Sequence, residues 1–397
     1  MAKEIKPLEK KNWTSSFTLI GKACVADYTF KLDQHSDKSD WIYNMMNLRV
    51  DCGDKYGRVA CELMGGYGAG RDNVIYVHGK DENGRDDFEN SYTIDWEDRF
   101  DEDILKDIGE LCFIKVGIEK DTKNNIVTNK FLTPYDAIAY VADNLQDGDE
   151  IKVMGQLKYT VYNDNVQVRK EVNRIYLKGE KEEYKSEFTQ SMLLNKYSIN
   201  KADKEKHVIP ITGYILEKFK EYNGNDLTEG GTVRGGKFVP LMKTFDFEYT
   251  EDNLEVRKKI LDKFFKVKKN VTQITCDGFF IEGGAVVEPT DVDISPDIQE
   301  MIDAGMYTKE EAIALCAGNR GREIRMCITR PTIRAVGEED QKTLQVQKFD
   351  DRFDEESLTP DYLIRKEDPD ENEDQTEDEE LNLDEVDDAA WLNQLGL

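Results

Sequence analysis

The order of strand-like and helical segments in the first half of the chain constrains its fold more than any other feature. Three segments rich in apolar and β-branched residues come first. Two more such segments follow a single helix. This helix is expected to run from Pro134 to about Asn144, with Thr133 as its N-cap. The strand segments are Phe17–Val25, Trp41–Cys52, Arg58–Met64, Ile151–Tyr162 and Val166–Leu177. This pattern predicts a five-stranded barrel.

A helix between strands three and four is the arrangement of the oligonucleotide-binding (OB) fold, a partly open five-stranded barrel. We predict an OB-type domain over residues 1–178, interrupted by an insertion over residues 69–132. The second half repeats the order with more decoration, including an amphipathic helix at Leu254–Phe265, and predicts a second OB-like domain over residues 207–349. The expected fold class is therefore mainly β with α insertions, with two OB-type five-stranded barrels.

Charged residues between the two expected barrels indicate a boundary. We predict a linker over residues 179–206, within which Gln190–Tyr197 favours a helix. Two more helices are expected in the second domain, one opening at Ser295 and one at a capping box that begins with Thr308. The two halves share the order of expected strands and helices but not the amino-acid sequence, which indicates a shared architecture without a sequence repeat.

The last part of the chain, residues 350–397, is expected to be an acidic disordered tail with an apolar tip. Glu367–Leu397 holds fourteen Asp or Glu residues and neither Lys nor Arg. Such a run buries too little apolar surface to offset its ordering entropy. A Trp and three Leu at the tip favour docking of partner proteins. A tail that only increases solubility is the alternative.

The net charge of −28 is unevenly distributed. The tail carries −14, and Asp81–Glu110, with thirteen acidic and three basic residues, carries −10. The rest is nearly balanced and can present a basic groove to an anionic partner, although the acidity argues against a histone-like binder. No apolar stretch is long enough to span a membrane, and we expect no secretory signal. Seven Cys without a CxxC motif are typical of reduced thiols, so the cytoplasm is the expected location.

Motifs for catalysis and cofactors are weak. Gly231–Lys237 fits the first seven places of a P-loop, but Phe238 replaces the magnesium-binding Ser or Thr and Pro240 prevents a proper helix. A flexible hairpin loop is the preferred interpretation. Gly65–Gly70 lacks dinucleotide-binding spacing and is expected to be a mobile loop. No His has a second His at metal-ligand spacing, and Asp86-Asp87 has no base or nucleophile nearby. We predict a protein that is not an enzyme and that binds no metal or cofactor.

Binding of single-stranded nucleic acid requires aromatic rings that stack on bases and cations that follow the phosphates. A lone strand aromatic is more often core, and a lone Lys or Arg is more often a solvated charge. Trp41 and Tyr43 are favoured because Ile42, on the opposite face, is the natural core residue. Tyr67 and Tyr162 are favoured because they flank turns. The candidate nucleic-acid-binding residues are Trp41, Tyr43, Arg49, Arg58, Tyr67, Lys158, Tyr159, Tyr162, Arg169, Arg174, Arg234, Lys237, Lys243, Phe245, Phe247, Tyr249, Arg325 and Arg330.

An OB-type body followed by an acidic tail with an aromatic-bearing tip resembles the single-stranded DNA-binding proteins of bacterial and phage replication. In that family the tail competes with DNA for the groove, and its tip recruits replication and repair proteins. The resemblance implies a partner-binding role for Trp391, Leu392, Leu395 and Leu397. The bacterial tip ends in Pro-Phe, which this chain lacks, and this difference suggests a phage partner set. Two barrels in one chain, against one in the bacterial tetramer, imply a monomer or homodimer.

We therefore predict a non-catalytic protein that coats single-stranded DNA in phage-type replication or recombination. Two other classes stay open. An acidic interaction protein, either a DNA mimic or an inhibitor of a host nucleic-acid enzyme, would use Asp81–Glu110 and the tail and would not bind DNA. A structural scaffold protein is the third class. A basic groove lined with aromatics would favour coating, and a uniformly acidic shell would favour mimicry.

Overall fold

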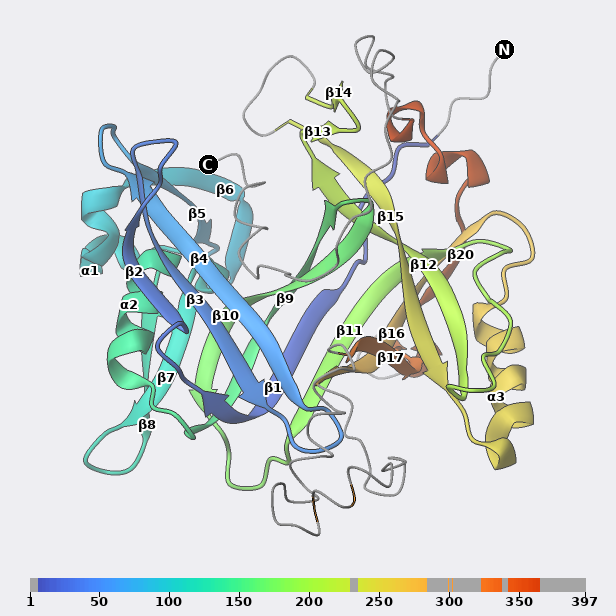
Figure 1. Cartoon of the computed structure of the whole chain (residues 1–397). Coiled ribbons are helices and arrows are strands. Elements are labelled where there is room, and N and C mark those ends of the chain that lie inside the picture. Colours follow the sequence, from blue (N-terminus) through green and yellow to red (C-terminus); the bar gives the residue numbers. More distant parts are fainter. Residues whose placement is uncertain are drawn as a thin grey trace, which may run out of the picture.

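The computed structural model describes residues 6–228, 235–283, 323–337 and 342–364, and the isolated positions 299 and 302. These residues form mainly strands, arranged in two closed rings that share one extended sheet (Figure 1). The predicted fold class, mainly β with α insertions and five-stranded barrels, is confirmed. The helices expected to open at Ser295 and Thr308 lie outside the described residues, as does the chain beyond residue 364.

The first ring closes in the order β1-β3-β4-β10-β9-β1. Neighbouring strands are antiparallel except β4 and β10, which are parallel. Helix α2 (Pro134–Asn144) lies between the third and fourth strands, as predicted, and the Thr133 hydroxyl accepts a hydrogen bond from the Asp136 N–H. The strands are β1 (Ser15–Cys24), β3 (Trp41–Asp51), β4 (Arg58–Gly68), β9 (Glu150–Tyr162) and β10 (Asn165–Leu177). This is the strand order of an OB barrel.

The insertion between β4 and α2 forms a small unit with its own apolar centre. Val77, Ile94, Ile108 and Phe113 are buried together there. Its strand β7 pairs with β10, which attaches the insertion to the main sheet. The elements are β5 (Val74–Lys80), β6 (Asp86–Asp95), η1 (Trp96–Phe100), α1 (Glu102–Leu105), η2 (Glu110–Cys112), β7 (Ile114–Lys120) and β8 (Ile126–Phe131). A further edge strand, β2 (Phe30–His35), pairs with β3.

The second ring closes in the order β11-β12-β15-β17-β16-β11, with β15 and β17 parallel. The helical segment α3 (Leu254–Ile260), flanked by η4 (Glu251–Asn253) and η5 (Leu261–Phe265), again lies between the third and fourth strands. The strands are β11 (Lys185–Leu194), β12 (Val208–Phe219), β15 (Lys237–Glu248), β16 (Val271–Gly283) and β17 (Glu323–Pro331). A two-stranded ribbon, β13 (Glu221–Tyr222) with β14 (Asn225–Asp226), follows β12.

Strand β11 corrects the expected linker over residues 179–206 and the helix expected at Gln190–Tyr197. The alternation of apolar and polar residues along β11 is hard to see in the sequence, because polar side chains occupy several buried positions. Gln190 accepts a hydrogen bond from the Ser15 hydroxyl, and Ser191 is hydrogen-bonded to Thr275 at 2.7 Å. Hydrogen bonds of this kind make buried polar residues tolerable in a strand. The other domain boundaries stay predictions.

The folded part of the chain continues past residue 350, where the tail was expected to begin. Strand β20 (Lys348–Phe353) pairs with β16, and Phe353 and Leu358 are buried in one apolar cluster. The Tyr362 hydroxyl donates a hydrogen bond to the Phe238 carbonyl at 2.8 Å. The remaining elements are β18 (Ile333–Val336), β19 (Thr343–Val346), η6 (Glu355–Leu358) and η7 (Asp361–Leu363).

The two rings are joined through their first strands. β1 pairs antiparallel with β11 over six positions, with Phe17 opposite Phe188. Both Phe side chains belong to one buried cluster that contains residues of both barrels. A continuous core of this kind indicates that the barrels are packed as one body.

A buried ion pair adds a second connection between the barrels. Lys170 of β10 pairs with Glu282 of β16, and their side chains are only 4% and 3% exposed. The second Glu282 carboxylate oxygen accepts a hydrogen bond from the Ala60 N–H at 3.0 Å. Both oxygens of this buried carboxylate therefore have partners in the first barrel.

We expect Lys170→Ala to lower the free energy of unfolding by about 3–5 kcal/mol, because it leaves the Glu282 carboxylate buried without its cation. Chemical denaturation measures the change. The matched control is Lys185→Ala, whose partner Glu187 is exposed, and here we expect a loss below about 1 kcal/mol. Equal losses in the two variants would contradict a structural role for the buried pair.

Candidate nucleic-acid interface

An aromatic pair lies on the outer face of the first barrel. Trp41 and Tyr43 are two residues apart on β3, so both side chains point away from the core that Met46, Leu48 and Val50 fill. Their rings are stacked, with centroids 4.6 Å apart and an interplanar angle of 14°. Both residues are half-buried. The predicted same-face arrangement of these two rings is therefore observed.

The strand beside the aromatic pair has no side chains at the matching positions. Gly68 lies opposite Trp41 in the register of β3 and β4, and Gly66 lies opposite Tyr43. A Cβ atom on Gly68 would collide with the Arg71 guanidinium, which therefore lies directly over this glycine. Arg71 is also paired with Asp40 at 3.4 Å and stays largely exposed. The structure thus places a cation next to the aromatic pair.

Sequence reasoning missed Arg71 because this residue lies in the turn after the glycine-rich stretch. The stretch looked like a mobile loop, and the structure shows instead that β4 continues through Gly65–Gly68. A signal was present in the sequence: two glycines at period-two spacing can face two aromatics on a neighbouring strand.

Cations from the neighbouring strands lie on the same outer surface. Arg49 follows Trp41 and Tyr43 on their face of β3 and forms no ion pair with any residue that the structure describes. Arg58 pairs with Asp51 at 3.6 Å and is exposed. On the β9–β10 hairpin, Lys158 is exposed and lies opposite Arg169, which is paired with Glu62 of β4.

Two of the remaining first-barrel candidates lie farther along this hairpin. Tyr162 precedes the β9–β10 turn and is half-buried. Arg174 lies beyond a β-bulge, in register with Lys115 of β7, and so faces the insertion. Tyr162 can extend the surface beyond Lys158, whereas Arg174 is displaced from it.

Tyr67 and Tyr159 are not part of this outer surface. Tyr67 lies opposite Ile42, on the other face of β4, and packs against Trp96 and Tyr135 at centroid distances of 5.2 and 5.4 Å. Tyr159 is 3% exposed, and its hydroxyl donates to Gln190 Oε1. Burial raises the pKa of Tyr159 well above its ordinary value. The prediction that the Tyr159 ring stacks on bases is wrong because this ring is buried, and the role of Tyr67 stays a prediction.

The predicted aromatics of the second barrel are core residues. Phe245 and Phe247 are 1% and 0% exposed, and Tyr249 is also buried. Period-two spacing correctly placed them on one face of β15, but that face is the inner one. The outer face carries Asp246 and Glu248 instead. The second barrel therefore has no counterpart of the Trp41–Tyr43 pair on this strand.

Two of the candidate cations in the second barrel are paired with carboxylates. Arg325 pairs with Asp246 at 2.6 Å and Glu248 at 3.4 Å, and Arg330 pairs with Asp277 at 3.3 Å. Lys243 points toward the first barrel, donates to the Val166 carbonyl at 3.1 Å, and has its pKa lowered by burial. Lys237 is exposed at the start of β15, whereas Arg234 and the tip residues Trp391, Leu392, Leu395 and Leu397 lie outside the described residues.

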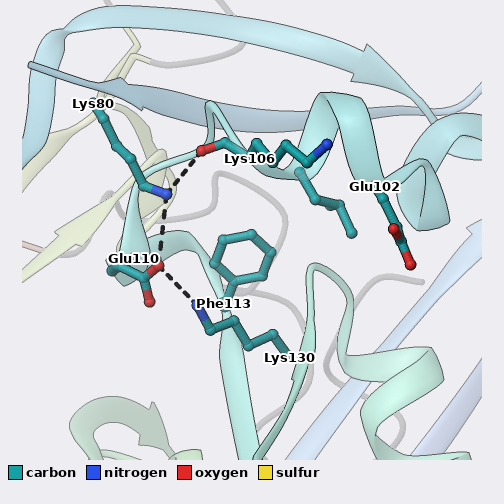
Figure 2. A pocket seen from close by; sticks show the side chains of 7 residues that line it. Lys80, Glu102, Lys106, Glu110, Phe113 and Lys130 are labelled. Carbon is teal, nitrogen blue, oxygen red and sulfur yellow. Dashed lines mark hydrogen bonds and ion pairs between the residues drawn. The ribbon is translucent and has the colours of Figure 1, made fainter. Parts of the chain in front are cut away.

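A hollow of about 390 Å³ lies in the insertion (Figure 2). Lys80, Lys115 and Lys130 converge on the Glu110 carboxylate, with N···O distances of 3.6, 2.8 and 2.8 Å. Hydrogen bonds from Lys115 and Lys130 lower the pKa of Glu110 to about 2. These lysines already have an anionic partner, so the hollow is a poor site for another anion.

The residues that the structure describes show neither a cluster of metal ligands nor a helix suited to a membrane. No group of three or more His, Cys, Asp or Glu side chains is placed to hold a metal ion there. None of the helices in these ranges is both long and apolar enough to cross a membrane.

No family model and no curated protein matches the chain. Among solved structures, it is similar to the wild-type single-stranded DNA-binding protein of Thermus aquaticus and to a deletion variant of that protein. Sequence identity is 9% in both cases, and the match covers 82% of this chain and 96% and 98% of the others, with TM-scores of 0.30 and 0.31.

Aromatic residues on the inner and outer faces should contribute differently to the free energy of unfolding. We expect Phe247→Ala to lower the free energy of unfolding by about 3–5 kcal/mol, because it leaves a cavity in the core. Tyr43→Ala, on the outer face, should cost less than about 1 kcal/mol. Urea denaturation of both variants measures this difference, and a larger loss for Tyr43→Ala would show that this ring is structural.

Proposed function

We propose that the chain binds single-stranded DNA on the outer face of the first barrel. The observation that carries the proposal is the stacked Trp41–Tyr43 pair beside two glycines and Arg71. Gly66 has no side chain beside Tyr43, and the Arg71 guanidinium lies over Gly68 beside Trp41, so a base that stacks on the rings has a cation next to it. Stacking on such a platform tolerates any base, since every base has a π-face.

The cations around the platform suit a phosphate backbone. Four further cations lie on the same sheet surface, between β3 and the β9–β10 hairpin: Arg49 and Lys158, and Arg58 and Arg169, which are paired with Asp51 and Glu62. Binding would release counterions, so affinity should fall steeply with salt. Since stacking and phosphate contacts carry little sequence information, we propose a coating function with weak sequence preference and no catalysis.

The acidic tail and the process that the protein serves are further parts of this proposal. The tail, with its Trp391-bearing tip, would compete with DNA for the cationic surface and recruit replication or recombination proteins of a phage-type system. The charge of Glu367–Leu397 and the apolar tip support this role. A protein that acts as an acidic DNA mimic is the competing hypothesis, and it predicts no DNA binding at all.

We expect Trp41→Ala and Tyr43→Ala each to weaken binding of a labelled oligo-dT strand by roughly 5- to 150-fold, which is the loss of one stacked base. Fluorescence anisotropy at two salt concentrations measures both the affinity and its salt dependence.

The matched control for these variants is Tyr197→Ala, which removes an aromatic side chain that is 71% exposed in the turn after β11. Its affinity should equal that of the unaltered protein. If all three variants bind equally well, the platform is not the binding site. If the unaltered protein does not bind at low salt, the coating function is refuted and mimicry gains support.

Removal of residues 367–397 should tighten DNA binding at low salt, because an internal competitor anion is lost. Trp391→Ala in the full chain should leave DNA affinity intact and abolish capture of replication partners. Anisotropy and pull-down experiments measure the two effects separately. Unchanged or weaker DNA binding after truncation would contradict the competition, and retained partners would contradict the docking role.

A further inference from the structure

A cysteine, a histidine and an aspartate meet in the insertion, away from the proposed DNA-binding surface. The Cys112 Sγ lies 3.2 Å from His78 Nδ1, and His78 Nε2 lies 2.7 Å from Asp86 Oδ1. The three residues come from η2, β5 and β6. Sequence reasoning found no base or nucleophile near Asp86, and the tertiary structure supplies both.

The hydrogen bonds assign a role to each ring nitrogen of His78. The Asp86 carboxylate can only accept, so it takes the Nε2–H proton and leaves Nδ1 unprotonated, while the Cys112 sulfur lies over the ring, 3.2 Å from Nδ1 and 3.8 Å from Nε2. Asp86 is itself held by the Leu111 N–H at 2.8 Å, and this bond, with the contact to His78, lowers the pKa of Asp86. The cluster has the order nucleophile, base and orienting carboxylate.

Two backbone features support this arrangement. The His78 N–H donates to Cys112 Sγ at 3.4 Å, which stabilises negative charge on sulfur. The Gly109 backbone packs closely against the cluster. A Cβ atom at this position would come within 2.5 Å of both His78 Cδ2 and Asp86 Oδ1. A side chain at position 109 would therefore displace the imidazole or the carboxylate.

Among the other cysteines that the structure describes, none is hydrogen-bonded to a histidine. Cys52, Cys61, Cys276 and Cys327 are buried, and burial raises the pKa of each thiol. Cys24 is partly exposed, as Cys112 is, and its thiol lies 3.8 Å from the Lys22 carbonyl and near Arg58 and Asp51. Cys24 is thus an internal reference with similar exposure and no base.

We propose that Cys112 is a nucleophilic thiol that exchanges with small disulfides, with His78 as its general base and Asp86 as a positioning residue. The Cys112 S–H proton moves to His78 Nδ1 as the sulfur attacks one sulfur of the disulfide. A new S–S bond forms at Cys112, the S–S bond of the disulfide breaks, and the departing thiolate takes the proton from His78. The products are a mixed disulfide on Cys112 and one free thiol.

The surroundings of the cluster indicate which disulfides it accepts. The Phe88 ring lies against His78 with a centroid distance of 4.6 Å and is 66% exposed. Leu111, next to Cys112, is 57% exposed. These side chains offer an apolar flank to the attacking sulfur, so an aromatic disulfide should react faster than a polar one.

Burial and the charge of Asp86 raise the pKa of the Cys112 thiol. The thiol is therefore protonated at rest, and its reactivity depends on removal of the proton by His78 during attack. This is the behaviour of a nucleophile that an adjacent base activates, and it separates Cys112 from a cysteine that is reactive as a preformed thiolate.

The test uses the full chain with 4,4′-dithiodipyridine or oxidised glutathione as the probe at neutral pH. Timed acid quenching and peptide mapping by mass spectrometry give the rate at each cysteine. Cys112 should react about a hundredfold faster than Cys24, the lower range of general-base catalysis. If Cys112 reacts no faster than Cys24 in the unaltered protein, the proposal is refuted without any variant.

Variants then separate base catalysis from simple accessibility. His78→Gln keeps a hydrogen-bonding side chain but removes the base, and should lower the Cys112 rate to that of Cys24. Asp86→Asn should lower the reaction rate of Cys112 in part. Asp86→Glu, which keeps a carboxylate, should give a Cys112 rate between those of Asp86→Asn and the unaltered protein. Thermal melting confirms that the variants are folded. A fast Cys112 in folded His78→Gln would overturn the role of the base and leave exposure as the cause.

Discussion

The antiparallel pairing between β1 and β11 is the constraint on which the rest of the structure depends. Each of these strands begins a five-stranded ring, and each uses part of its length to pair with the other. The pairing protects two edges that would otherwise be unpaired, and it brings Phe17 and Phe188 into one shared core. Two further contacts join the barrels that this pairing sets side by side, namely the buried Lys170–Glu282 ion pair and the hydrogen bond from the Tyr159 N–H to the Glu217 carboxylate.

Similar topology did not give the two barrels similar surfaces. On β3 the outer positions carry Trp41 and Tyr43, and the inner positions carry aliphatic core residues. On β15 the aromatics are inside and the carboxylates of Asp246 and Glu248 are outside. A strand with period-two aromatics can therefore contribute either a platform or a core. The choice depends on which face the barrel encloses, so the proposed DNA-binding surface belongs to the first barrel.

The insertion shows how an acidic segment can hold ordered chemistry. Its carboxylates are not a uniform negative shell. Glu110 is surrounded by three lysines, Asp101 caps α1, and Asp86 orients His78 beside Cys112. Such paired and hydrogen-bonded acids contribute to the structure of the unit and leave less free charge than the composition suggests. The insertion is thus better described as a small folded unit than as an acidic arm.

The sequence by itself determined the ring order of the first barrel, because its five strands have clear alternation and Thr133 with Pro134 marks the helix between them. It also placed Trp41 and Tyr43 on one face, since side-chain direction along a strand has a fixed period of two. Only the tertiary structure decided which face is inside, as Phe247 shows. It alone revealed β11, where polar Gln190 and Ser191 occupy buried positions and are satisfied by distant partners. The meeting of Cys112, His78 and Asp86 likewise depends on contacts between segments far apart in the chain, which local patterns do not encode.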